Sequence, residues 1–199
     1  MQKNFILLLI LVHLLLAVSF LSDLLFWVMF TISFFLLSLA SLRYGKFEYP
    51  NFSISNIAIA ILSGLLMYSL FYIGKIGSAI LFQNELTNVA TLYMRIQPQL
   101  TWHYVALFLV IIPGEELFWR GFIQRNIEAK FENKLLVIVI SSLLYMSANI
   151  YTLNPLFLLA TFAGGVVWGA LYMWNRNILL TILSHLVFNL FLLVLFPIF

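Results

Sequence analysis

The chain has 199 residues, of which 64% are hydrophobic and only 9% are charged. Soluble domains carry about 25% charged residues, so this composition excludes an ordinary soluble domain and indicates an integral membrane protein. The net charge of +3 is modest and the basic residues are scattered between apolar runs, which favours topology signals and contact with membrane lipids over nucleic-acid binding.

Apolar runs of about 17 to 20 residues recur along the chain, and each is long enough to cross a hydrocarbon core about 30 Å thick. We therefore predict an all-α fold, a polytopic bundle of about seven transmembrane helices. In chain order, the predicted spans are 5–21, 24–42, 54–72, 102–119, 135–151, 156–174 and 178–196. We divide the chain into an N-terminal part, residues 1–101, and a core, residues 102–199, which contains the last four spans.

The segment of residues 75–101, between the third and fourth predicted spans, mixes charged and apolar residues. Glu85 and Arg95 lie within it. This polarity predicts an interfacial helix or a re-entrant loop, and leaves an eighth span as the alternative.

The distribution of basic residues predicts the orientation of the chain. With the N-terminus inside, the outer segments hold only Lys75 and Arg95. The inner segments then hold Lys3, Arg43, Lys46, Arg125, Lys130, Lys134 and Arg176. This asymmetry follows the positive-inside rule, so we predict a multi-pass cell-membrane protein with a cytoplasmic N-terminus.

Three ionisable residues lie together at the end of the fourth predicted span: Glu115, Glu116 and Arg120. Charges inside a membrane are costly and usually face the interior of the helix bundle. Glu116 and Arg120 are four residues apart, so they share a helix face and can pair. Glu115 points about 100° away around the helix and is free to face a different environment. A carboxylate in a less polar site can act as a general base towards water; a purely structural ion cluster is the alternative.

His185 and Asn189 form a second pair, four residues apart on one face of the last predicted span. A buried imidazole beside an amide suits proton transfer, metal ligation or oxyanion stabilisation. Hydrogen bonding between helices, without chemistry, is the alternative. His13 and His103 are predicted to have structural or interfacial roles.

Tyr145 and Asn149 form a third pair with the same spacing, in the fifth predicted span. An amide in an apolar helix needs a partner, so hydrogen bonding between helices is the default interpretation of this pair. Gly164, Gly165 and Gly169 in the sixth span predict close helix packing rather than ligand contacts.

The three pairs, taken in this order, resemble the CPBP family of intramembrane proteases. The family includes the CAAX prenyl endopeptidases and bacterial proteins linked to bacteriocin maturation and immunity. Its first motif, Glu-Glu-x-x-x-Arg followed by Gly, is matched by Glu115, Glu116, Arg120 and Gly121.

The third family motif, His-x-x-x-Asn or Asp, is matched by His185 and Asn189. The second motif, Phe-x-x-x-His, aligns with a departure from the pattern, because Tyr145 replaces the phenylalanine and Asn149 replaces the histidine. The resemblance covers about residues 102 to 193.

The resemblance implies a role for each matched residue. Glu115 would activate a water, His185 would assist it, and Asn189 would help to bind the developing oxyanion. Glu116 and Arg120 would form a supporting ion pair.

Asn149 is the residue on which the expected activity depends. An amide cannot accept or relay a proton near neutral pH, and it is a poor transition-metal ligand. The chain has no cysteine, and one carboxylate with one histidine falls short of the three protein ligands usual for catalytic zinc. We therefore expect no bound metal at this site and name no cofactor, although a divalent metal ion is possible in the family.

Two functions follow from this reading. The first is a membrane endopeptidase, a hydrolase that cleaves a membrane-associated peptide or protein, with Asn149 orienting substrate or water. The second is a catalytically impaired pseudoprotease that binds a membrane partner as a scaffold, regulator or bacteriocin-immunity factor. A proton-coupled transporter is a third reading, but it does not explain the ordered motifs.

Overall fold

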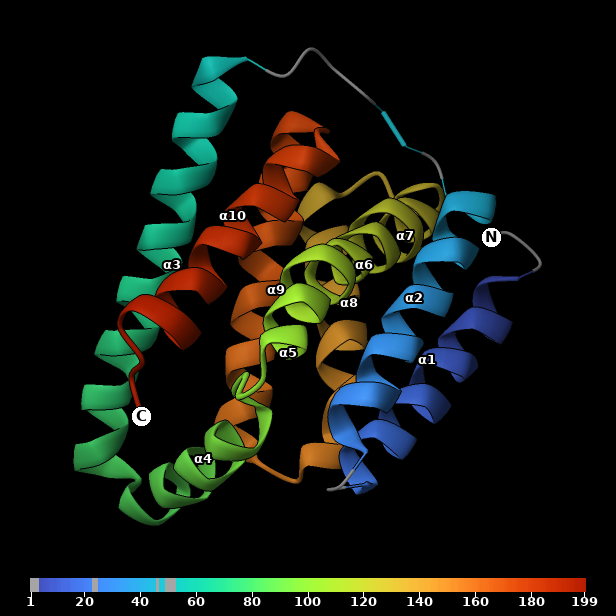
Figure 1. Ribbon diagram of the computed structural model, residues 1–199. Helices are drawn as coiled ribbons and strands as arrows, with labels where there is room; N and C mark the ends of the chain where they lie inside the picture. The colour runs from blue at the N-terminus through green and yellow to red at the C-terminus, as the bar shows by residue number, and fades with distance from the viewer. Residues whose placement is uncertain (1–3, 23–24, 46, 49–52) are drawn as a thin grey trace.

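The computed structural model describes residues 4–22, 25–45, 47–48 and 53–199. These residues form an all-α bundle of eight helices when directly contiguous helical segments are joined (Figure 1). The predicted polytopic helical fold is confirmed.

Four helices make up the N-terminal part. Their bounds are Phe5–Leu21 for α1, Phe26–Tyr44 for α2, Ile54–Leu81 for α3 and Gln83–Ile96 for α4. α1 and α2 pack against each other, and Ser19 Oγ lies 3.4 Å from Ser33 Oγ across their interface. α3 begins where the Ser53 side chain accepts a hydrogen bond from the backbone N–H of Asn56, an N-cap.

α3 continues nine residues beyond the predicted end at Tyr72, to Leu81. The sequence suggested an earlier end because Lys75 interrupts the apolar run. In the structure, the Lys75 ammonium donates to the backbone carbonyl of Ile198 and lies 4.8 Å from the centre of the Phe199 ring. The charge is therefore accommodated by the C-terminal segment, and the helix does not need to stop.

α4 is the segment for which the sequence left two readings. It has 14 residues, about 21 Å at a rise of about 1.5 Å per residue, which is short of a hydrocarbon core of about 30 Å. Only Tyr93 of this helix is buried. Its length and polarity favour the interfacial helix over an eighth span.

A continuous helical run from Thr101 to Glu128, hereafter the central helix, crosses the middle of the bundle (Figure 1). It consists of α5 (Thr101–Ala106), a π-helical segment (Leu107–Ile111), α6 (Ile112–Glu116), a second π-helical segment (Leu117–Gln124) and α7 (Arg125–Glu128). Pro113 has no N–H to donate, and the first π-helical segment lies beside it. The run extends past the predicted end at Trp119 because Phe122 and Ile123 are still fully buried.

The last three helices each begin at an asparagine cap. Their bounds are Lys134–Ala148 for α8, Pro155–Asn175 for α9 and Ile178–Leu190 for α10, which continues as a π-helical segment, Phe191–Leu195. The side chains of Asn133, Asn154 and Asn177 accept hydrogen bonds from the first-turn N–H groups of the helices that follow them. These caps explain the short connections between successive helices.

α3 packs on α10 at one edge of the bundle, while α1 and α2 form the other edge, where α2 contacts the central helix (Figure 1). α8 and α9 pack closely against each other. A Cβ atom on Gly165 would lie 2.9 Å from the Cβ of Ser142, so this glycine permits the close approach.

In the part of the chain that the structure describes, five helices are long and apolar enough to cross a membrane: α2, α3, α9, the run Lys134–Thr152 and the run Ile178–Leu195. α1 is a shorter apolar helix of the same character. The chain is therefore a multi-pass membrane protein. Lys3 and Lys46, which contribute to the predicted orientation, lie outside the described residues, and the cytoplasmic N-terminus stays a prediction.

Candidate functional site

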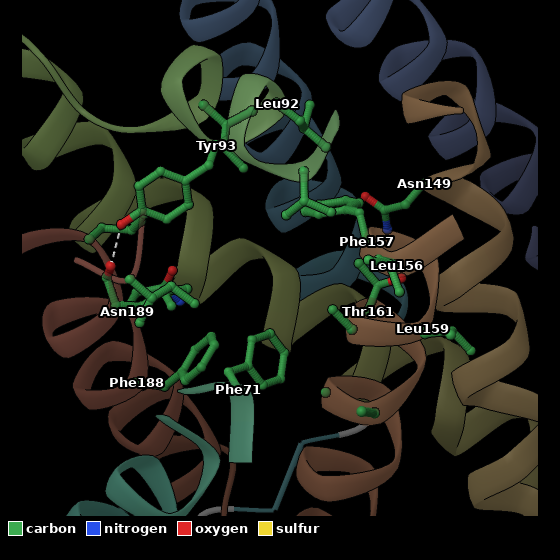
Figure 2. Close-up of a pocket in the computed structure, with 18 of the residues that line it drawn as sticks. Phe71, Leu92, Tyr93, Asn149, Leu156, Phe157, Leu159, Thr161, Phe188 and Asn189 are labelled. Carbon is green, nitrogen blue, oxygen red and sulfur yellow. Dashed lines mark hydrogen bonds between the residues drawn. The ribbon is translucent and has the colours of Figure 1, made fainter. Parts of the chain in front are cut away.

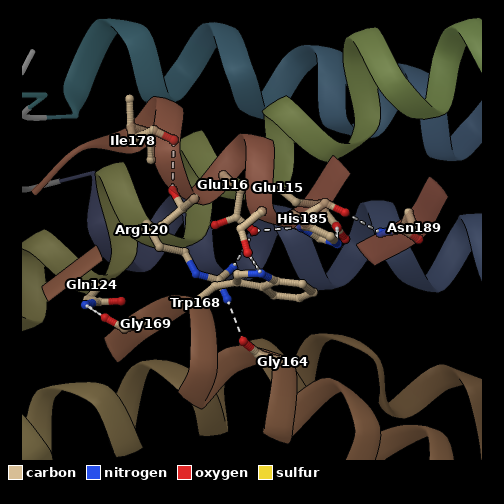
Figure 3. A network of polar contacts seen from close by, with 12 residues as sticks. Glu115, Glu116, Arg120, Gln124, Gly164, Trp168, Gly169, Ile178, His185 and Asn189 are labelled. Atoms are coloured by element: carbon tan, nitrogen blue, oxygen red, sulfur yellow. Dashed lines mark hydrogen bonds and ion pairs between the residues drawn. The ribbon is translucent and has the colours of Figure 1, made fainter. Parts of the chain in front are cut away.

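The glutamate pair lies in α6, where the central helix is enclosed by the other helices. Glu116 is completely buried and Arg120 is 2% exposed. Arg120 Nη1 lies 3.2 Å from Glu116 Oε1, so the ion pair expected from the spacing of four residues is present (Figure 3). Glu115 lies on a different side of the helix and remains 12% exposed.

His185 of α10 lies between the two carboxylates. Its Nδ1 is 2.8 Å from Glu116 Oε1, and its Nε2 is 3.8 Å from Glu115 Oε2 (Figure 3). The sequence paired Glu116 with Arg120 and His185 with Glu115. The structure adds a direct contact between His185 and Glu116, so the imidazole connects both acids.

Arg120 is held by more than its carboxylate partner. Its Nη2 donates to the carbonyl oxygen of Gly164 at 3.2 Å. Its guanidinium carbon lies 5.2 Å from the centre of the Tyr145 ring and 5.6 Å from that of the Trp168 ring, within the range of cation–π attraction. Because these partners hold the buried Arg120 guanidinium, its positive charge stays next to the Glu116 carboxylate.

Trp168 of α9 is a site residue that the sequence reasoning missed. Its ring is stacked on the His185 imidazole, with centroids 3.7 Å apart and an interplanar angle of 22°. Its Nε1 donates to Ser184 Oγ at 3.3 Å. The sequence did contain an indication of Trp168. It lies among Gly164, Gly165 and Gly169, and a large residue within a glycine-rich helix face points into the packed side of the span.

Asn189 and Asn149 each use one amide N–H in their own helix. Asn189 Nδ2 donates to the carbonyl of His185, and Asn149 Nδ2 donates to the carbonyl of Tyr145. The sequence reasoning expected Tyr145 and Asn149 to bond to other helices. For Asn149 the hydrogen bond is instead within α8 and its C-cap, and the residue also lines the cavity described next.

A cavity of about 490 Å³ brings these groups together. Glu115, Tyr145, Asn149, His185 and Asn189 all line it. The remaining wall is mostly apolar and includes Phe71, Leu92, Tyr93, Leu156, Phe157 and Phe188 (Figure 2). The site is thus a small polar cluster at the side of a large apolar cavity, which suits a ligand with an apolar body and one reactive polar group.

The donor set does not fit a catalytic metal. Among the described residues there is no group of three or more His, Cys, Asp or Glu side chains that could hold a metal ion. Glu116 Oε1 is already shared by Arg120 and His185 Nδ1, which leaves Glu115 and His185 Nε2 as good ligands facing the cavity. Two such ligands fall short of the three usual for catalytic zinc.

An ionic cluster of Glu48, Arg125, Glu128 and Arg176 holds the end of the central helix. Arg125 lies 2.7 Å from Glu48 and 3.0 Å from Glu128, and Arg176 donates to both carboxylate oxygens of Glu128. The hydrogen bond from Arg176 is the main cause that lowers the pKa of Glu128, and attraction to both arginines adds to it. The cluster ties the helix that carries the glutamate pair to the turn between α9 and α10.

His13 and His103 lie outside the site. His13 Nδ1 is 3.2 Å from the Tyr151 hydroxyl, and His103 Nδ1 accepts hydrogen bonds from the backbone N–H groups of Gln99 and Leu100. These contacts join helices or stabilise a helix start.

The fold and the site together define a class: a polytopic helical membrane protein with an ionisable site inside the bundle, as in intramembrane proteases. Residues 97–191, slightly less than half of the chain, match the family model "Type II CAAX prenyl endopeptidase Rce1-like". The chain therefore carries a domain of the Rce1-like type II CAAX prenyl endopeptidase family, within the CPBP group. No curated protein and no solved structure matches the chain.

Proposed function

We propose that the protein is an intramembrane endopeptidase in which Glu115 activates a water molecule. The observation that carries the proposal is the placement of Glu115 and His185 on the wall of one cavity, with Glu115 Oε2 and His185 Nε2 3.8 Å apart. At this separation both atoms can contact the same water. Glu115 takes a proton from the water, and the resulting hydroxide attacks the carbonyl carbon of the scissile peptide bond.

Attack of hydroxide gives a tetrahedral intermediate with a negative oxygen. Asn189 and Asn149 each keep one amide N–H beyond the bond to their own helix, and both line the cavity. Preorganised amide donors of this kind stabilise an oxyanion. The proton held by Glu115 then passes to the leaving amine as the C–N bond breaks, so one water is consumed and Glu115 is regenerated.

Glu116 and Arg120 support this chemistry without touching the substrate. Glu116 accepts from His185 Nδ1, which fixes the tautomer with an unprotonated Nε2 facing Glu115 and the water. Arg120 compensates the charge of Glu116, so Glu115 remains the carboxylate that can take up a proton.

The substrate we propose is a membrane-associated peptide or protein whose apolar portion occupies the cavity. The mostly apolar wall supports this, and so does the family domain of residues 97–191. Cleavage of a prenylated C-terminal sequence is the narrower form of the proposal, taken from the description of the matched family.

The test is a cleavage assay with purified protein in liposomes, with prenylated and unprenylated peptides scored by mass spectrometry. We expect Glu115→Gln and His185→Gln to abolish cleavage, whereas Glu132→Gln, a substitution of an exposed carboxylate, leaves it intact. Equal cleavage by wild type, Glu115→Gln and His185→Gln would show that the activity belongs to another site or to a contaminant.

A second candidate function rests on Asn149, which stands where the family motif has histidine. An amide cannot relay a proton, so the site can instead serve a pseudoprotease that binds a membrane peptide or partner without cleaving it. Binding of a peptide to wild type and to Glu115→Gln with equal affinity, with no product from either, would favour this function. The family match gives no support to a role in bacteriocin immunity.

A further inference from the structure

Trp168 contacts both halves of the site, although it belongs to none of the three motifs. Its indole lies against the His185 imidazole, at 3.7 Å between centroids, and near the Arg120 guanidinium, at 5.6 Å. It is only 2% exposed. We propose that Trp168 is a positioning residue: it holds the plane of the His185 ring so that Nδ1 meets Glu116 while Nε2 faces Glu115. This inference rests on the proposed peptidase function.

The His185 ring needs such a support. Apart from Trp168, the short side-chain contact of this ring among the described residues is that of Nδ1 with Glu116, and the distance from Nε2 to Glu115 is 3.8 Å. One contact fixes a point on the ring but not its plane, and rotation of an imidazole about its second side-chain torsion is broad. A flat ring at stacking distance removes this freedom.

The indole is itself fixed from two sides. Its Nε1 donates to Ser184 Oγ, which lies 2.8 Å from Ser63 Oγ on α3. Figure 3 shows the indole alongside both the histidine and the arginine. The serines connect α9, α10 and α3, so the indole follows the packing of three helices.

Gly164 is a second, independent sign that the indole must lie where it does. A Cβ atom at this position would come within 2.8 Å of the Trp168 ring, so the ring would have to shift. The carbonyl of Gly164 also accepts the hydrogen bond from Arg120. Glycine at 164 therefore leaves room for the indole and keeps the backbone close to the arginine.

The test compares four variants. Trp168→Leu removes the ring face, Trp168→Phe keeps a smaller face without the N–H, and Gly164→Ala displaces the indole with the tryptophan retained. Trp174→Leu is the matched control, because Trp174 is on the same helix but 66% exposed.

The first readout is kinetic. We expect Trp168→Leu and Gly164→Ala to lower kcat by roughly 10²-fold with little change in KM, as expected for a misplaced reacting group. Trp168→Phe should recover most of the loss, and Trp174→Leu should behave as wild type. Trp168→Phe as inactive as Trp168→Leu, with both folded, would overturn a role for the ring face.

The second readout does not depend on activity. The chain has three histidines, so ring-labelled histidine gives a nuclear magnetic resonance spectrum of three sets of signals, and His185→Gln assigns the one of interest. We expect the His185 ring protons to be shifted upfield by the indole in wild type, and the shift and the single nitrogen tautomer to be lost in Trp168→Leu. An unchanged His185 spectrum in Trp168→Leu would overturn the proposal whatever the activity. Wild type without peptidase activity but with the expected spectrum would refute the proposed function alone.

Discussion

The buried pair of Glu116 and Arg120 gives the sharpest stability prediction. Arg120→Met keeps most of the length of the side chain but removes the only guanidinium that the described structure places beside Glu116. Because Glu116 is 0% and Arg120 2% exposed, neither water nor lipid headgroups can replace the lost partner.

The size of the effect follows from these contacts. Removing one partner of a buried ion pair costs about 3–5 kcal/mol, because the other charge is left uncompensated. The bond from Arg120 to the Gly164 carbonyl is lost as well, for about 1 kcal/mol. At the lower end of that range, we expect a net loss of about 3 kcal/mol. For a chain of this size that corresponds to a fall in Tm of about 6–12 °C.

The assay is SDS titration in mixed micelles followed by tryptophan fluorescence, together with thermal unfolding in detergent. The matched variant is the double substitution Glu116→Gln with Arg120→Met. The glutamine oxygen can still accept from His185 Nδ1 and no charge is left without a partner. We expect the double variant to lose only about 1 kcal/mol, so the two substitutions are strongly coupled.

Two results would refute this reasoning. One is a loss below about 1 kcal/mol in Arg120→Met, which would mean that water or another cation reaches Glu116. The other is a double variant that loses the sum of the two single substitutions, which would mean that the pair is not coupled.

Three further predictions use other parts of the structure. Gly165→Val should lower stability by about 1–3 kcal/mol in the same titration, because its side chain would collide with Ser142 and force α8 from α9. Glu128→Gln should be less stable than wild type by about 1 kcal/mol at pH 7. Arg176 lowers the pKa of Glu128 in the folded protein. The stabilisation by the Glu128 carboxylate is therefore present above its usual pKa of 4.5 and is lost as the pH falls through the lower folded pKa. At that low pH the melting curves of wild type and Glu128→Gln should converge. Asn149→His restores a second histidine at the cavity and should raise kcat by at least about tenfold in the cleavage assay; an unchanged kcat would show that this position does not limit the reaction.

The sequence predicted the order of the apolar helices well, because crossing a membrane requires long apolar runs. It predicted about seven spans, whereas five of the described helices are long and apolar enough to cross a membrane and α1 is a shorter apolar helix. α1 begins and ends at the predicted residues, and α9 and α10 begin within one residue of theirs. The errors lie where a polar residue is accommodated by tertiary contacts. Lys75 interrupts an apolar run, but the carbonyl of Ile198, far along the chain, accepts its bond, and no local pattern could show this.

The sequence predicted which candidate residues share a helix face, but not how they meet across helices. A spacing of four residues predicts which side chains share a helix face, and this suffices for Glu116 with Arg120. It says nothing about how two helices rotate against each other. The approach of His185 Nδ1 to Glu116, and the stack of Trp168 on His185, depend on the packing of α9 and α10 against the central helix.

The geometry also explains why the adjacent Glu115 and Glu116 can have different roles. A single arginine pairs with Glu116 among the described residues of the site, and that carboxylate also holds His185 Nδ1. Glu116 is thereby occupied twice, away from the cavity, whereas Glu115 lines it. This asymmetry supports the proposal that Glu115 is the general base, and in that proposal the chemistry also depends on Asn149, which lines the same cavity.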